Sequence, residues 1–470
     1  MSNTSNKNKI QTLIKNATII NEYKTFQGSI LITGDIISKI IISPTILEEA
    51  EKGANKIINA EGLYLIPGVI DDHVHFRDPG DTYKGDIKTE SRAAILGGVT
   101  SFMDMPNNNP PTNTIEALEK KYKHASEESS ANYSFYLAAT NDNIEEIKKI
   151  NPENTCGIKI FMGSSTGNLL VNNNNSLQEI FSNAPCLIAT HCETEEIIQN
   201  NLKNAKNKYT DPVTKKIDIP FSEHPNIRNR ESCLKSSLKA INLAEETGAR
   251  LHILHVSTKE ELEAIEQARI NNKNITAEAC VSYLWFDDRD YAAMGAKIKC
   301  NPAIKSVADK IKLRESVRNS IIATVGTDHA PHLFSEKNKD YLNSPSGIPM
   351  IQHSLQLMLQ LSEEGIFTME RVVRLMCHKP AECFNIKNRG FIREGYYADL
   401  VLIQPAFIKP YKVTKKNIAY KCKWSPLEGS TFNYKIHSTF VNGTQVVSKG
   451  RLTGKTNSMR LLFNSDKSIK

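Results

Sequence analysis

The stretch that decides the fold is Val69-Ile-Asp-Asp-His-Val-His-Phe-Arg77, which ends an apolar run beginning at Leu63. In an extended strand, successive side chains point to opposite faces, so His73 and His75 share a face and can bind one metal ion. Arg77 lies just beyond them. Chance supplies about 0.3 His pairs of this spacing in a chain with 12 histidines among 470 residues. The stretch therefore indicates a strand that ends in a metal site, provided that the rest of the chain supplies further ligands.

Composition and charge exclude several classes of protein. A hydrophobic content of 40% and a charged content of 24% are typical of a soluble globular protein. The net charge of +7 comes from lysines interspersed with acidic residues, without an aromatic-interleaved basic block, so we expect no nucleic-acid partner. No run approaches the roughly 18 apolar residues of a membrane span, so we expect no membrane association. Nine cysteines, an odd number in a long chain, favour reduced thiols and a cytoplasmic location.

The middle of the chain alternates between strand-like and helix-like segments. The strand-like runs are Val69–His75, Val99–Met103, Tyr133–Ala138, Gly157–Met162, Cys186–His191, Leu251–Val256, Ile275–Ser282 and Ala323–Thr327. Helix-like segments between them include Lys84–Leu96, Thr114–Glu128, Glu145–Ile150, Arg228–Glu246, Lys259–Asn271 and Ala303–Asn319. This alternation predicts an α/β fold, a (β/α)8 TIM-like barrel closed by a helix over Pro349–Glu363. An open doubly wound sheet is the rival, but no Gly-x-Gly-x-x-Gly turn follows the first strand.

Both ends of the chain have a different texture, with short strand-like runs separated by Asn, Gly and Asp. These runs are Thr12–Ile20, Gly28–Ile32, Ile36–Ile42, Gly390–Ile403, His437–Val447 and Gly450–Leu452. We therefore predict a small β-sandwich domain built from residues 1–62 and 388–470, with the barrel formed by residues 63–387.

In a barrel of this kind, functional residues gather at the C-terminal ends of the strands. Five of the eight predicted strands end, or nearly end, in a candidate metal ligand. The candidate ligands are His73, His75, Lys159, His191, His255 and Asp328. A single histidine after a strand is often structural, so the prediction depends on the placement that these residues share.

Lys159 lies inside the otherwise apolar strand Gly157–Met162. Burial disfavours its ammonium form and favours the neutral, nucleophilic amine. A neutral lysine can take up carbon dioxide to form a carbamate, which is an anion able to bridge two cations. The alternative is a lysine at the strand end whose amine reaches solvent.

Imidazole and carboxylate ligands suit zinc and its first-row neighbours. We expect two zinc ions, bridged by carboxylated Lys159 and a hydroxide, because this arrangement uses all six candidate ligands. The ions would lower the pKa of the bound water and polarise a carbonyl oxygen for attack. Asp328 is placed to take the proton of that water and pass it to a leaving nitrogen, which is general acid/base catalysis.

Together, these motifs resemble the amidohydrolase superfamily of cyclic amidases. They are His-x-His after the first strand, Lys159-Ile-Phe-Met-Gly163, His191, His255 and Thr327-Asp-His-Ala-Pro-His332. Within that superfamily, His73-Val-His-Phe-Arg-Asp-Pro-Gly80 is similar to the dihydroorotases. The resemblance covers nearly the whole chain, from Ile19 to about Val447.

The resemblance implies the reversible cyclisation of N-carbamoyl-L-aspartate to L-dihydroorotate in de novo pyrimidine biosynthesis. This substrate has a free carboxylate, and the Arg77 guanidinium is suited to bind it through two hydrogen bonds. By family position, Asn107 and His332 would assist in binding and Asn301 would contact the ring. Asn107 has an alternative role, because it lies in a Pro- and Asn-rich turn that it could simply shape.

Two positions depart from the family pattern. Ser282-Tyr283 stands where many relatives carry paired histidines, and Asn108 stands where Thr is common. We expect neither position to bind metal, so they bear on the lining of the pocket and not on the chemistry.

Three alternatives remain open from the sequence. Allantoinases and hydantoinases or dihydropyrimidinases share the lysine-bridged metal pair, but Arg is not expected at position 77 in them. A catalytically silent scaffold relative should have lost metal ligands, which this chain retains.

Among partners we expect a small-molecule substrate and a second copy of the chain, because a homodimer is the commonest oligomer. The polar loops Tyr209–Glu223 and His332–Ser346 are candidate lids.

Overall fold

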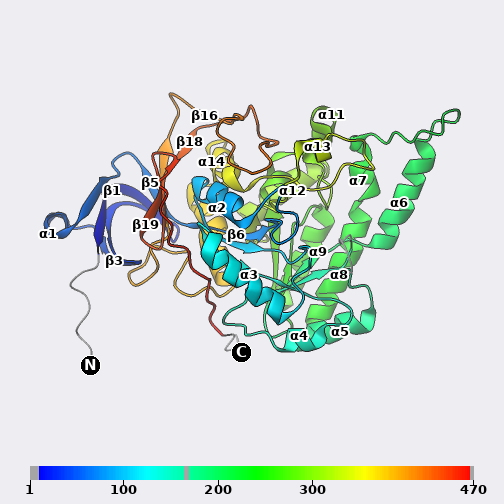
Figure 1. Cartoon of the computed structure of the whole chain (residues 1–470), viewed down its shortest axis with the longest axis horizontal. Coiled ribbons are helices and arrows are strands. Elements are labelled where there is room, and N and C mark those ends of the chain that lie inside the picture. Colours follow the sequence, from blue (N-terminus) through cyan, green and yellow to red (C-terminus); the bar gives the residue numbers. More distant parts are fainter. Residues whose placement is uncertain (1–9, 164–168, 466–470) are drawn as a thin grey trace.

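The structure is a computed structural model that describes residues 10–163 and 169–465. Figure 1 shows a sheet made from both ends of the chain beside a larger unit in which helices surround parallel strands. None of the helices in the described ranges combines the length and hydrophobicity of a membrane span.

The parallel strands form two sheets. One has the order β6–β7–β8 and the other the order β9–β10–β11–β12–β13–β14, so neighbours in space are also neighbours in sequence. The strands are β6 (Val69–Val74), β7 (Val99–Asp104), β8 (Asn132–Phe135), β9 (Leu137–Ala138), β10 (Ile158–Phe161), β11 (Ile188–His191), β12 (Leu251–Ile253), β13 (Ile275–Cys280) and β14 (Thr324–Gly326). The α/β prediction is therefore confirmed at the level of parallel strands alternating with helices.

The two sheets meet at both edges. Only Tyr136 separates β8 from β9. At the other edges, Val74 forms a parallel bridge with His329, and the His75 backbone N–H donates to His329 O at 2.7 Å. These junctions are consistent with the predicted barrel, although the hydrogen-bonded ladder is divided into two sheets.

Helices of very different lengths connect and cover these strands. The longer ones are α2 (Ile87–Leu96), α3 (Ile115–Glu128), α5 (Asn174–Asn183), α6 (Glu195–Lys208), α8 (Arg230–Thr247), α9 (Lys259–Asn271), α12 (Val307–Arg318) and α14 (Ser354–Glu363). The shorter ones are α4 (Ile144–Lys148), α7 (His224–Ile227), α10 (Val281–Trp285), α11 (Tyr291–Met294), α13 (Phe334–Lys337), α15 (Met369–Val373) and α16 (Lys379–Cys383). Short 3-10 segments are η1 (Phe221–Glu223), η2 (Asp288–Asp290), η3 (Gly295–Ile298) and η4 (Ile351–His353), and η5 (Arg374–His378) is π-helical.

Strands from both chain ends pair in one nine-stranded sheet. Its order is β20–β19–β18–β15–β5–β1–β2–β3, with β4 paired to β1. The strands are β1 (Gln11–Asn21), β2 (Lys24–Thr33), β3 (Ile36–Ile41), β4 (Lys56–Asn59), β5 (Tyr64–Pro67), β15 (Leu400–Pro405), β18 (Tyr434–Val441), β19 (Thr444–Ser448) and β20 (Arg451–Leu452). A separate pair joins β16 (Tyr411–Lys412) to β17 (Thr431–Phe432), and helix α1 (Pro44–Gly53) follows β3. The sheet includes β5 and therefore extends past residue 62. The limits of the β-sandwich domain, residues 1–62 and 388–470, stay a prediction.

The turn between β18 and β19, near the C-terminal end of the chain, packs against the N-terminal turn between β2 and β3. Asn442 and Gly443 have φ values of 45° and 74°, as a tight two-residue hairpin turn requires. A Cβ on Gly443 would lie 2.1 Å from Gly34 O, so glycine allows the C-terminal hairpin to approach the β2–β3 turn.

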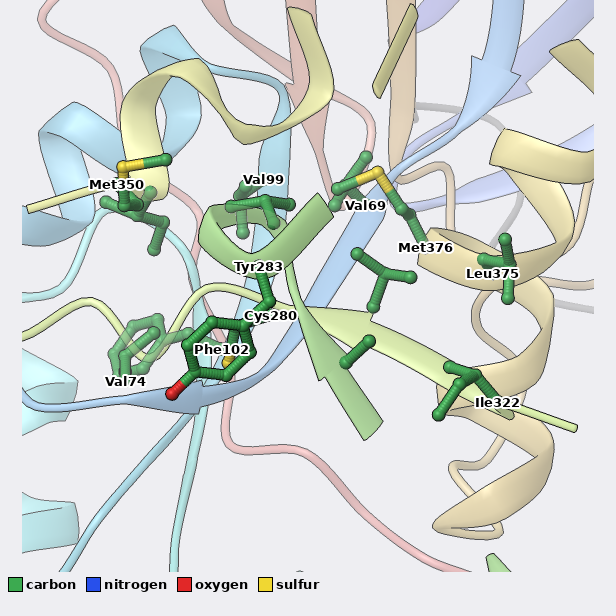
Figure 2. Packing of buried hydrophobic residues seen from close by; sticks show 14 of the residues in the cluster. Val69, Val74, Val99, Phe102, Cys280, Tyr283, Ile322, Met350, Leu375 and Met376 are labelled. Atoms are coloured by element: carbon green, nitrogen blue, oxygen red, sulfur yellow. The ribbon is translucent and has the colours of Figure 1, made fainter. Parts of the chain in front are cut away.

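The main core lies between the strands and their helices. Figure 2 shows Val69 of β6 and Val99 of β7 in one apolar cluster with Leu375 and Met376 of η5. Every residue of β6 is buried, because helices and neighbouring segments cover both faces of a parallel sheet. The same rigid strand carries His73, so the core positions the site.

Most predicted strands and helices occur within a few residues of their expected limits. Three predictions need correction. The run Tyr133–Ala138, expected as one strand, is divided at Tyr136 into β8 and β9, which belong to different sheets. The run expected to extend to Ser282 leaves the strand at Cys280 and continues as helix α10. The expected strand Gly390–Ile403 begins only at Leu400, because the preceding residues form turns.

Candidate metal centre and active-site cavity

A cavity of about 450 Å³ opens at the C-terminal ends of the parallel strands. All ten residues predicted from the sequence line it: His73, His75, Arg77, Asn107, Lys159, His191, His255, Asn301, Asp328 and His332. His73 lies in β6, Lys159 in β10 and His191 at the end of β11. The structure therefore brings together residues that are up to 259 positions apart (332 − 73).

One group of candidate ligands consists of His73, His75 and Asp328. Asp328 Oδ1 lies 3.0 Å from His75 Nε2 and 3.3 Å from His73 Nε2. The other ring nitrogens face acceptors, since His73 Nδ1 lies 3.0 Å from Glu278 Oε2 and His75 Nδ1 lies 2.7 Å from Asn107 Oδ1. In its neutral form, a ring that donates through Nδ1 presents the lone pair of Nε2 to Asp328.

This arrangement fits a bound cation. An imidazole lone pair and a carboxylate oxygen at this distance repel each other unless a cation or a proton lies between them. Burial raises the pKa of Asp328, but His73 and His75 outweigh burial and lower that pKa to about 2. The donor set of two imidazoles and one carboxylate is one that zinc and its neighbours accept.

The second group is the pair His191 and His255. His191 Nδ1 lies 2.9 Å from His255 Nε2, and His191 Nε2 lies 2.9 Å from Glu193 Oε2. Glu193 is fully buried and accepts hydrogen bonds from Arg228, which fixes its carboxylate. His255 Nδ1 is buried without a hydrogen-bond partner. His191 Nδ1 and His255 Nε2 lie close enough to share a hydrogen bond or to bind one cation together.

Lys159 is only 1% exposed, and its Nζ lies 4.8 Å from the centre of the Phe161 ring. Among the described residues, Nζ has neither a hydrogen-bond acceptor nor an ion-pair partner. Burial lowers the pKa of Lys159 to about 8. A buried amine without a carboxylate partner is the form of lysine that can add carbon dioxide.

Arg77 lies beside the metal ligands in the same cavity. Its Nε donates to Pro331 O at 3.2 Å, and Nη2 lies 3.0 Å from His332 Nε2. No carboxylate of the described ranges lies within ion-pair distance of its guanidinium, and burial lowers the pKa of Arg77. Asn301 also faces the cavity, and its Oδ1 is buried without a hydrogen-bond partner. The cavity therefore holds a cation and an acceptor that are available to a ligand.

Three site residues have left-handed backbone conformations. The φ values are 67° for Arg77, 39° for His255 and 47° for Asp328. This conformation costs about 1–3 kcal/mol for a residue other than glycine. The surrounding fold must offset that cost, which is typical of functional sites.

Six further residues line the cavity that sequence reasoning did not select: Phe161, Glu195, Ala330, Pro345, Ser346 and Gly347. Gly347 has φ 144°, and a Cβ there would lie 2.6 Å from Ala330 O. Only the second predicted lid loop reaches the cavity, since none of residues 209–223 lines it. The departures at Asn108, Ser282 and Tyr283 also lie outside the cavity lining.

Two buried lysines hold the loop that carries Pro345 and Ser346. Lys299 Nζ donates to Tyr341 O and Ser344 O, both at 2.6 Å. Lys337 Nζ donates to Lys299 O at 2.9 Å and to Pro345 O at 2.8 Å. Neither amine forms an ion pair within the described ranges. The amines therefore act by tying backbone carbonyls together behind the cavity wall.

We predict that Lys337→Met lowers the stability of the protein and weakens substrate binding. Two buried carbonyls lose a donor, which costs about 2–3 kcal/mol and frees the loop. Thermal unfolding and KM are the measurements, with the exposed Lys339→Met as the matched control. A Lys337→Met protein that unfolds and binds substrate like the control would contradict this role.

Comparison with known proteins gives the family. A model described as the amidohydrolase family matches residues 64–446. The chain belongs to the amidohydrolase family. Members of this family are hydrolases that act on cyclic amides, generally with two metal ions, and the His73, His75 and Asp328 group of this amidohydrolase is a candidate metal site.

The relatives of this amidohydrolase differ in activity. A dihydroorotase from Methanosphaera stadtmanae is 32% identical over 409 residues, which are 86% of this chain and 89% of that protein. An allantoinase from Bacillus velezensis is 31% identical over 444 residues, which are 93% and 94% of the two chains. The solved structure of an L-hydantoinase (dihydropyrimidinase) from Arthrobacter aurescens aligns with a TM-score of 0.89 at 27% identity, covering 96% of this chain and 99% of that chain. Similarity alone therefore does not select the substrate.

Proposed function

We propose that this amidohydrolase is a dihydroorotase, which interconverts N-carbamoyl-L-aspartate and L-dihydroorotate in de novo pyrimidine biosynthesis. Arg77 carries the proposal, because its guanidinium lines the cavity without a carboxylate partner in the described ranges. The free carboxylate of this substrate would supply that partner through charge-assisted hydrogen bonds. Asn301 Oδ1 would accept a ring N–H, while Asn107 and His332 would border the same ligand.

For the metal centre we propose two zinc ions and a carboxylated Lys159. His73, His75 and Asp328 would hold one ion, His191 and His255 would hold the other, and the Lys159 carbamate would serve both. When bound, the ions would polarise the amide carbonyl and lower the pKa of a water molecule.

Proton transfer in this proposal belongs to Asp328. Its carboxylate would take the proton of the attacking water and deliver it to the ring nitrogen as the amide bond breaks. Ring closure would use the same group in the opposite direction. Arg77 would hold the substrate carboxylate throughout, so that the amide carbon stays in reach of the attacking atom.

The remaining proposals concern the chain as a whole. We propose that the two parallel sheets close as a (β/α)8 barrel through their Tyr136 and Val74–His329 junctions. Residues 1–62 and 388–470 would form the second domain, as a β-sandwich. We further propose a cytoplasmic homodimer, without nucleic-acid or membrane partners.

A substrate comparison tests the proposed function. Zinc-loaded protein should hydrolyse L-dihydroorotate and form it from N-carbamoyl-L-aspartate. Allantoin and hydantoin have no free carboxylate for Arg77 and should react slowly. Turnover of allantoin or hydantoin without turnover of dihydroorotate would instead establish the activity named for the Bacillus velezensis or the Arthrobacter aurescens relative.

Arg77→Gln should lower kcat/KM for dihydroorotate by about 100-fold, mainly through KM, while zinc content stays unchanged. Loss of a charge-assisted contact of about 3 kcal/mol accounts for this factor. Arg77→Lys should recover only part of the loss, because an ammonium cannot form the same two parallel bonds. The exposed Arg92→Gln is the matched control. Arg77→Gln kinetics equal to those of this control would remove the carboxylate-binding role.

A further inference from the structure

A second cavity, of about 630 Å³, lies at the opposite ends of the parallel strands. Four of its lining residues directly precede a parallel strand. They are Leu187 before β11, Arg250 before β12, Asn274 before β13 and Ala323 before β14. The metal-ligand candidates lie at the other ends of these strands, so the two cavities are distinct. Its volume is within the roughly 300–1,000 Å³ of small-molecule sites.

The lining of this second cavity is cationic. Arg250, Arg269, Lys273 and Lys379 contribute positive charges, and Glu382 is the single acidic residue of the described lining. A low-dielectric concave surface with one predominant sign of charge attracts ions of the opposite sign. The cavity therefore favours anionic molecules.

Cys383, the last residue of α16, also lines this cavity and contacts a histidine. Its Sγ lies 3.7 Å from His252 Nδ1 and 3.4 Å from Thr276 Oγ1. On the other side of the ring, His252 Nε2 lies 3.5 Å from Asp72 Oδ2. The carboxyl group of Asp72, the imidazole of His252 and the thiol of Cys383 thus lie in a row of neighbouring groups, and the thiol faces the cavity.

This geometry favours the thiolate of Cys383. Burial raises the pKa of the Cys383 thiol, but the His252 imidazole outweighs burial, and the net pKa lies below the usual value. Burial lowers the pKa of His252, while Cys383 and Asp72 outweigh it and raise that pKa to about 10. An imidazolium paired with a thiolate is the arrangement that activates cysteine as a nucleophile.

The other cysteines provide an internal comparison. All nine are buried, and none forms a disulfide bond in the described structure. Burial raises the pKa of seven of the other eight: Cys156, Cys192, Cys233, Cys280, Cys300, Cys377 and Cys422. Cys422 is 6% exposed against 9% for Cys383, and the contact of its Sγ is with Trp424 O rather than with an imidazole. Cys422 therefore matches Cys383 in exposure and differs in its partner.

We propose that Cys383 is a thiol-modification site that forms a mixed disulfide with small anionic disulfides entering the cationic cavity. The Cys383 thiolate attacks one sulfur of the small disulfide, and a new S–S bond forms as the original S–S bond breaks. The other half leaves as a thiolate and takes a proton from water. The Cys383 sulfur is oxidised from the thiolate to the disulfide level while the departing sulfur is reduced from the disulfide to the thiolate level, so no further oxidant is required.

The test treats the reduced, full-length protein with three disulfides of different charge. These are oxidised glutathione, which is anionic, hydroxyethyl disulfide, which is neutral, and cystamine, which is cationic. Peptide mapping by mass spectrometry under native conditions gives the rate at each cysteine. Oxidised glutathione should modify Cys383 at least about ten-fold faster than Cys422, because only Cys383 has the imidazole partner. Each rate at Cys383 is divided by the rate at which the same disulfide reacts with a free thiol in solution. This ratio should be highest for the anionic disulfide and lowest for the cationic one.

Two variants separate the contribution of the cavity from that of the thiol. Cys383→Ser should remove the fast adduct. Lys273→Gln combined with Lys379→Gln should slow oxidised glutathione about three-fold or more and leave hydroxyethyl disulfide unaffected. Exposed Lys203→Gln with Lys415→Gln is the matched control, and thermal unfolding confirms that each variant is folded. Equal rates at Cys383 and Cys422, reaction only after denaturation, or no dependence on disulfide charge would each overturn the proposal.

Discussion

Lys159→Ala is expected to abolish zinc binding and amidase activity together. Lys159 is buried among the candidate ligands, and within the described ranges its amine contacts the Phe161 ring but has neither a hydrogen-bond acceptor nor an ion-pair partner. Removing a group shared by both ions should lower zinc content to one ion or fewer per chain. Loss of about 4 kcal/mol of transition-state stabilisation corresponds to a roughly 1,000-fold lower kcat. Metal analysis of the purified protein and steady-state kinetics measure the two effects.

Two controls separate this effect from misfolding. Thermal unfolding of the metal-free proteins should differ little between wild type and Lys159→Ala, because the alanine only empties space beside Phe161. A short carboxylate such as propionate should restore part of the zinc content, since it can occupy that space and supply the missing anion. Wild-type protein reconstituted in labelled bicarbonate should show a carbamate signal by carbon NMR that the variant lacks. Full zinc content and full activity in Lys159→Ala would show that the bridging role is wrong.

Most strands of the parallel sheets are predictable from the sequence, because each is a short apolar run bounded by polar residues. The helices are less predictable. Helix α6 buries only Ile198 and Ala205 fully, so its apolar period is too sparse to stand out. The apolar run of α10, Val281–Trp285, is equally compatible with a strand, and only the path after Cys280 decides between them.

The site was predictable where one strand end supplied one ligand. His73, Lys159 and His191 could be selected because a barrel places all strand ends at one face. The groups that orient them were harder to select. Glu193 was visible two residues after His191, but its role depends on Arg228, which is 35 positions away and is brought close only by folding.

The loop behind the cavity illustrates the same limit. Pro345, Ser346 and Gly347 carry no chemical signature in the sequence, and they line the cavity because Lys299 and Lys337 bind the carbonyls of their loop. Such backbone contacts depend on tertiary structure alone. Residue types that perform chemistry can therefore be read from a pattern, whereas residues that shape the space around them cannot.

The largest expected effect on turnover alone is that of Asp328→Asn. The amide keeps the size of the carboxylate and can still place an oxygen near His73 and His75, but it cannot take up and return a proton. We expect kcat to fall by about 1,000-fold or more, within the range for loss of general acid–base catalysis, while KM changes little because Arg77 is intact.

Zinc content distinguishes this result from that of Lys159→Ala. Asp328 is one ligand of one ion, and His73 and His75 remain, so Asp328→Asn should retain most of its zinc after purification. Asp218→Asn, at an exposed residue outside the cavity lining, is the matched control for the loss of one carboxylate. If Asp328→Asn lost zinc and activity in the same proportion, Asp328 would be a ligand only, and the proton would have to travel through another group. A full complement of zinc with a kcat reduced by the expected factor would instead assign the proton transfer to the carboxylate that contacts both histidines.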